Sequence, residues 1–160
     1  MKSLRIIVPL ALFALVAWVA SVALAATTPF NATYAGRVTE KVSGTAVTAS
    51  ATGKGKGTLV KASSITGVVH ASTANPPCSP FNGPGSIKSA AGIIKLKVLP
   101  VSRGCAAGSD DQDNISLSGS AKVLGGTKKF KRARGTLRFT GHYDRAEGKF
   151  TVRLRGKLTY

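Results

Sequence analysis

The chain has 160 residues, 43% of them apolar, and a formal net charge of +17. This length suits one domain with a sizeable core, and the excess of cations predicts a surface that attracts polyanions at low salt. The chain has only two cysteines and two histidines, and no histidine lies near either cysteine in the sequence, so the composition does not support a cysteine–histidine metal centre.

The first 25 residues have the features of a secretory signal peptide. Two cations precede an apolar run that ends in Ala-Leu-Ala at residues 23–25, which is the small-residue pattern of a cleavage site. The alternative is a retained membrane anchor, because residues 6–26 are long enough to span a bilayer, but Pro9 interrupts the run. We therefore expect a secreted protein with a mature domain at residues 26–160 and no transmembrane segment after cleavage.

Alternating side chains predict the first strands of the mature domain. Residues 30–42 place Phe30, Tyr34 and Val38 in one phase, and Glu40 continues this inward phase near the strand end. Three glycines spaced by two follow between residues 45 and 60. Their spacing matches neither glycine-rich phosphate-binding pattern, so it indicates sharp curvature or close packing in a barrel. Residues 65–72 predict a further short strand.

The middle of the chain predicts two loops around one strand. Residues 75–85 contain four prolines, which is typical of a loop that cannot supply ladder hydrogen bonds. Residues 93–99 alternate as a strand, which Pro100 is expected to end. Residues 103–114 form the second predicted loop.

Each of these loops holds one cysteine. An even pair in an exported chain predicts a disulfide between Cys78 and Cys105, with a reactive thiol as the alternative. The second loop also holds Asp110, Asp111 and Asp113, whose oxygens could serve calcium. Their spacing does not fit an EF-hand, so we interpret them as a polar surface loop.

The clearest alternation lies in the last 36 residues and in the strand before them. Residues 115–123 alternate, and residues 128–133 predict one helical turn. Residues 136–143 and 150–160 then form a hairpin whose inward residues are Leu137, Phe139, Gly141, Tyr143, Phe150, Val152, Leu154, Gly156, Leu158 and Tyr160. Seven or eight strands separated by turn signals predict an all-β fold, either a closed antiparallel barrel or a sandwich. Of the two, we expect a single antiparallel β-barrel of about eight strands with one disulfide.

A family resemblance supports the barrel. The sequence Gly-Gly-Thr at 125–127, then Phe130, Ala133, Arg134 and Gly135, followed by residues 136–144, resembles the turn and strand of allene oxide cyclase-like and dirigent-like barrels. It is also similar to small secreted bacterial proteins of unknown function. The resemblance implies an eight-stranded barrel with a central cavity and a phenylalanine that plugs one end. Lys128 stands where such sequences usually have glycine, and no catalytic residue of these families matches this chain.

The most distinctive functional feature of the sequence is a group of cations near the C-terminus. The paired donors of arginine guanidinium groups and the charges of lysine ammonium groups could hold phosphate or sulfate groups. Alternatively, these cations form a solvated surface that only promotes solubility. Few outward aromatics accompany these cations, which argues against specific nucleic-acid recognition. The candidate polyanion-binding residues are Lys128, Lys129, Lys131, Arg132, Arg134, Arg138, Arg153, Arg155 and Lys157.

Two functions follow as hypotheses. The first is a non-enzymatic module whose basic outer face binds an anionic cell-envelope polymer, polysaccharide or lipid headgroup. The alternative is a barrel whose interior binds or isomerises a small apolar molecule, with Tyr34, Glu40 and Tyr143 as its inward polar groups. No arrangement of residues specifies a reaction, so we name no catalytic residue, cofactor or metal.

Overall fold

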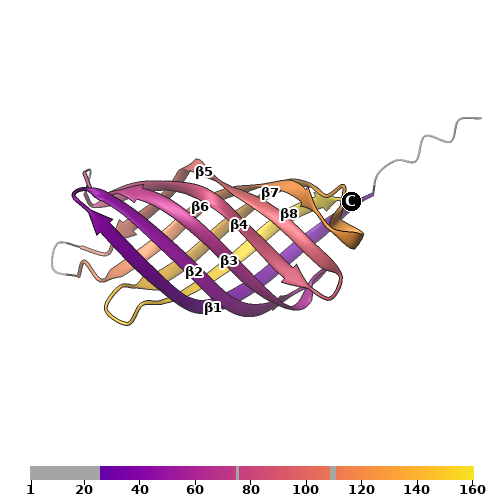
Figure 1. The fold of residues 1–160 in the computed structure, drawn as a ribbon, viewed down its shortest axis with the longest axis horizontal. Coiled ribbons are helices and arrows are strands. Elements are labelled where there is room, and N and C mark those ends of the chain that lie inside the picture. The colour runs from indigo at the N-terminus through magenta and orange to yellow at the C-terminus, as the bar shows by residue number, and fades with distance from the viewer. Residues whose placement is uncertain (1–25, 75, 109–110) are drawn as a thin grey trace, which may run out of the picture.

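The computed structural model describes residues 26–74, 76–108 and 111–160. Its strands form a closed barrel in which each strand pairs antiparallel with the next and the last pairs with the first (Figure 1). The strands are β1 (Thr27–Ser43), β2 (Ala46–Gly57), β3 (Lys61–Ser72), β4 (Cys78–Ser89), β5 (Gly92–Ala106), β6 (Asn114–Gly126), β7 (Arg134–Asp144) and β8 (Lys149–Thr159). The predicted eight-stranded antiparallel barrel is confirmed, and its closure leaves the sheet without an edge.

The predicted signal peptide at residues 1–25 lies outside the described residues. Within the part of the chain that the structure describes, no helix has the length and apolar character needed to cross a bilayer. The one helical element among the described residues is η1 (Lys128–Phe130), a short 3-10 turn between β6 and β7, within the range where the sequence predicted a helical turn. It lies at the same end of the barrel as the C-terminus (Figure 1), and we call this end the closed end.

The phase of the C-terminal hairpin is also as predicted. Leu137, Leu154 and Leu158 are buried inside the barrel, whereas Arg138 and Arg155 are exposed and directly opposite each other across the β7–β8 ladder. Successive side chains of a strand point to opposite faces, so one buried face fixes the register of both strands.

The predicted loop at residues 75–85 is wrong for most of its length, because Cys78–Ser89 is strand β4. An irregularity in pairing accommodates one of the prolines in this strand. Pro84 lies in a gap of the β3–β4 ladder, between the pairs His70–Asn82 and Gly67–Gly85. Pro84 therefore interrupts no residue pair on the β3 side, although it pairs with Lys97 on the β5 side.

The expectation that Pro100 ends its strand is likewise wrong, because β5 runs from Gly92 to Ala106. Residues 99–101 have no register partner in either neighbouring ladder, since the pairs jump from Val98 to Ser102 on the β4 side and from Val98 to Arg103 on the β6 side. The irregularity thus accommodates the proline, as β-bulges do. The second predicted loop accordingly shrinks to the connection after Ala106.

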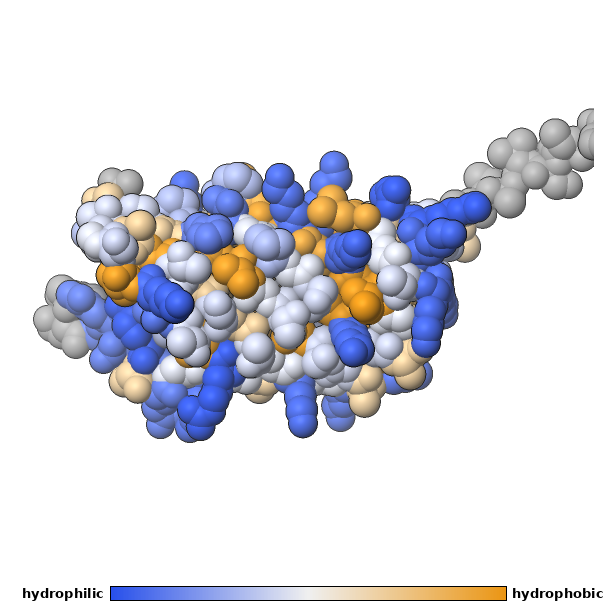
Figure 2. All heavy atoms as spheres, in the orientation of Figure 1, coloured by the Kyte–Doolittle hydropathy of each residue, from blue (hydrophilic) through white to orange (hydrophobic). Residues whose placement is uncertain are grey.

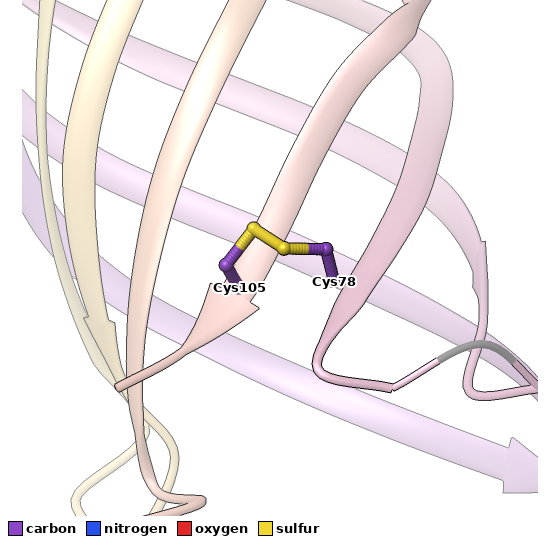
Figure 3. The surroundings of a disulfide bond; sticks show 2 residues. All are labelled: Cys78 and Cys105. Carbon is purple, nitrogen blue, oxygen red and sulfur yellow. A yellow bond between two sulfur atoms is a disulfide. The ribbon is translucent and has the colours of Figure 1, made fainter. Parts of the chain in front are cut away.

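The disulfide between Cys78 and Cys105 is confirmed, and it joins directly opposed residues of β4 and β5 (Figure 3). The bridge lies where β4 begins and β5 ends, at the end of the barrel opposite η1. We call this the open end. The disulfide bond holds the two strands together beside the connection that leads to β6.

The glycines of β2 serve close packing, as their spacing predicted. Gly55 is directly opposite Tyr34, and a Cβ atom at residue 55 would lie 2.7 Å from Cδ1 of Tyr34 and would collide with the carbonyl oxygen of Thr33. Without side chains at Gly53 and Gly55, the Tyr34 and Phe150 rings lie against the β2 backbone. Tyr34 is consequently fully buried.

Candidate functional site

The barrel interior is divided into a packed half and a hollow half. At the closed end, large side chains fill the interior: Phe30, Tyr34, Val60, Ile87, Ile94, Val123, Phe130, Leu137 and Leu158, each no more than 2% exposed. Phe130 from η1 contributes to this seal and meets Tyr160 edge-on, with ring centroids 5.6 Å apart. From the middle of the barrel to the open end, a cavity of about 940 Å³ replaces the packed side chains.

The hollow half follows from the size of the inward side chains. In the open half, β2 and β3 turn the small residues Ala49, Ala51, Gly67 and Ala71 toward the interior, and all four line the cavity. In the closed half, Tyr34 and Leu137 occupy the corresponding interior. The interior of an eight-stranded barrel is just wide enough for its side chains to fill, so the small residues of β2 and β3 leave room for a ligand.

The cavity wall is mostly apolar. Larger side chains from the opposite strands complete it, among them Leu96, Leu117, Phe139, Phe150 and Leu154. Phe81 and Phe139 face each other with their ring centroids 6.0 Å apart. The chemistry of the lining therefore suits an apolar molecule.

Polar side chains gather at the mouth of the cavity. Nε of Arg145 lies 3.6 Å from Oε2 of Glu40, and the Glu40 carboxylate also acts on the pKa of the Tyr143 hydroxyl. The backbone N–H of Arg145 donates to the carbonyl of Asp113 at 2.9 Å, which ties the β7–β8 turn to the connection before β6. The mouth therefore brings together residues from β1, β7 and the turn after β7.

The surroundings of Tyr143 at the mouth shift its pKa. Burial raises the pKa of Tyr143 to about 12, the Glu40 carboxylate adds to the increase, and Arg145 opposes it. A neutral phenol is the form that can donate a hydrogen bond to a carboxylate. Tyr143 thus remains a donor over the whole physiological pH range.

The three predicted cavity residues are separated by the fold. Glu40 and Tyr143 both line the cavity. Tyr34 lies in the packed half, where its hydroxyl is 3.0 Å from Oγ of Ser63, and burial raises its pKa while this hydrogen bond opposes the increase. Sequence reasoning missed Arg145, which lies between the two predicted hairpin strands, because strand alternation gives no phase to a turn residue.

The nine predicted polyanion-binding residues are all exposed. Lys128, Lys129, Lys131 and Arg132 surround η1 at the closed end, and Nζ of Lys129 lies 5.0 Å from the centre of the Tyr160 ring. The others project from the outer faces of β7 and β8. Figure 2 shows the side of the barrel on which β2 and β3 lie, where hydrophilic side chains project singly between pale and apolar residues.

The described part of the acidic loop has a structural role. Oδ1 of Asp111 accepts the backbone N–H of Asn114 at 3.1 Å, and Oδ2 accepts the Asn114 side-chain amide at 2.6 Å. Asp110 lies outside the described residues. Among the residues that are described, no group of three or more His, Cys, Asp or Glu side chains is placed to hold a metal ion.

The chain was compared with protein families, curated proteins and solved structures. No family model matches the chain. Neither the curated proteins nor the solved structures contain a match. The function is therefore argued from the barrel and its cavity.

Proposed function

We propose that the barrel interior binds one small, mainly apolar molecule. The observation that carries this proposal is the apolar cavity of about 940 Å³ inside a barrel that is sealed at its other end. Sites for small molecules are typically concave, apolar and about 300–1,000 Å³ in volume, with a few polar groups that fix orientation. Eight-stranded barrels are of the size that holds a single such ligand.

The polar mouth defines the orientation and class of this ligand. Its apolar body would lie against Leu96, Phe139 and Leu154, and its polar group would lie at the mouth beside Glu40 and Arg145. Glu40 and Arg145 neutralise each other. A charged headgroup would be attracted to one partner and repelled by the other, so the mouth favours an uncharged hydroxyl or carbonyl.

Binding is favoured over isomerisation by the same contacts. Glu40 is the carboxylate of the cavity lining and would be the base of such a reaction. Its oxygens already face Arg145 and the Tyr143 hydroxyl. We therefore propose that the protein is an exported carrier. Its disulfide, the signal-peptide features of residues 1–25, and the resemblance to allene oxide cyclase-like and dirigent-like barrels support this proposal.

A fluorescent titration tests the proposal. N-Phenylnaphthylamine, a neutral apolar probe, should bind the full-length protein saturably with one site per chain. Ala51→Trp places a large side chain in the cavity and should weaken binding about tenfold or more, which is about 1.4 kcal/mol. Ser50→Trp is the matched control, because residue 50 is the exposed neighbour on the same strand, and it should bind as the unmodified chain does.

Two outcomes would contradict the proposal. Binding that never saturates would show that no defined site exists, and equal losses in the two variants would place the site outside the cavity. Competition then tests the ligand class: dodecanol should displace the probe better than dodecanoate or dodecylamine. A clear preference for dodecanoate would refute the argument for an uncharged polar group while leaving the cavity site intact.

A further inference from the structure

The outer surface of β5–β8 carries like charges in opposed positions. Lys97 is directly opposite Lys122, and Arg138 is directly opposite Arg155. We define the basic wall as six of the exposed cations of these four strands: Lys97, Lys122, Arg138, Arg153, Arg155 and Lys157. Like charges at opposed positions of an antiparallel pair destabilise a sheet.

Carboxylates that would neutralise the basic wall lie elsewhere. The described acidic residues are Glu40, Asp111, Asp113, Asp144 and Glu147, all near the open end. The ion pairs of the described residues join Arg145 to Glu40 and Lys149 to Glu147, so neither includes a cation of the basic wall. The positive charge of the wall is left available to an external anion.

Hydroxyl groups separate the cations of the basic wall. Thr136 lies between Lys122 and Lys157 in register, and Thr140 lies between Ser118 and Arg153. Such hydroxyls can donate hydrogen bonds to phosphate or sulfate oxygens beside the charged contacts. The wall thus offers donors and charges in rows that cross several strands.

The scarcity of exposed apolar side chains on β5–β8 favours a polymer over a bilayer as the partner of the basic wall. Among the described residues of β5–β8, the exposed large apolar side chains are Val101 on β5 and Leu124 on β6. Protein surfaces that lie in a membrane interface combine basic residues with an apolar face that enters the bilayer. The basic wall has charge and hydroxyls without such a face.

We infer that the basic wall binds a linear polyanion, a chain of phosphate or sulfate groups that crosses β5–β8 on the outside of the barrel. Arginines can hold such oxyanions through paired donors, and displaced counterions contribute to the affinity. Lys128, Lys129, Lys131 and Arg132 adjoin β7 through Arg134 and would extend the contact toward the closed end. The cavity mouth lies at the other end and stays accessible.

Salt-dependent binding of full-length protein to inorganic polyphosphate and to heparin tests this inference. The variant Arg138→Gln/Arg155→Gln should weaken binding about tenfold at low salt and should make the plot of log affinity against log salt shallower by about 2, one unit per lost contact. The control Lys41→Gln/Lys54→Gln removes the same charge from exposed positions of β1 and β2. It should retain most of the affinity and the slope.

The outcomes separate the possible partners. Tighter binding to polyphosphate assigns the phosphate polymer, and tighter binding to heparin assigns the sulfated one. Equal losses in the two double variants would show that net charge alone acts and would overturn the inference, as would failure to bind either polymer. Binding to vesicles of anionic phosphatidylglycerol without binding to either polymer would replace the polymer with a lipid surface and would also overturn it.

Discussion

Replacing each of two phenylalanines by alanine tests the division of the barrel into a packed and a hollow half. Phe130 is fully buried in the packed half and contacts the Tyr160 ring. Phe139 is 8% exposed, contacts Phe81 on one side and lines the cavity. The two substitutions remove the same atoms from different surroundings.

The expected costs differ because only one substitution creates a new void. Phe130→Ala loses the transfer free energy of the ring and leaves an empty space among packed neighbours, which costs about 3–5 kcal/mol. Phe139→Ala enlarges a cavity that is already present, so the transfer term dominates, at about 1.5–3 kcal/mol. The free energy of unfolding should therefore fall further for Phe130→Ala, by about 1.5–2 kcal/mol.

Urea unfolding followed by circular dichroism measures this difference. The dependence of the free energy on urea should keep the same slope in both variants, so that the midpoints report stability alone. Equal costs, or a larger cost for Phe139→Ala, would refute the assignment of the hollow half. The alternation of the sequence does not by itself predict this difference, since phase does not distinguish the two halves.

Three further predictions follow from single features of the structure. Lys128 has a positive φ of 50°, so Lys128→Gly should raise the free energy of unfolding by about 0.5 kcal/mol, whereas the neighbouring control Lys129→Gly should lower it; thermal melts compare the two. The pKa of Tyr143 is raised to about 12 from 10.0. The contribution of Tyr143 to stability is therefore complete below pH 10 and is lost as the pH rises to about 12. Glu40→Gln should lower this pKa, which the absorbance of tyrosinate measures. Replacing Arg138, Arg153 and Arg155 together by Gln should leave the melting temperature unchanged or slightly raised, because these exposed cations repel one another; a large decrease would mean that the outward phase is wrong.

Local alternation was sufficient to predict the strands that the core specifies most clearly. Each inward residue of β7 and β8 is apolar or glycine and each outward residue is polar, so a shift of register by one residue would expose the core. The pattern failed at β4, where Pro84 suggested a loop. Whether a proline interrupts a ladder depends on the partner strand, and here the gap lies opposite Val68 and Val69.

The candidate site was less predictable because position along the barrel axis matters as well as phase. Tyr34 and Val38 share one phase, yet Tyr34 is sealed in the packed half and Val38 lines the cavity. The level at which the interior becomes hollow depends on side chains from all eight strands, which no local window contains. Arg145 reaches the mouth because the turn that carries it is bonded to the Asp113 carbonyl, a contact distant in sequence.

A crystal structure of the protein under xenon pressure would test the hollow interior most directly. Xenon enters empty apolar cavities without needing a specific functional group. We expect xenon sites in the open half, among Leu96, Phe139 and Leu154, and none among the packed side chains around Phe130. An interior free of xenon and filled by side chains at the open end would contradict the hollow half.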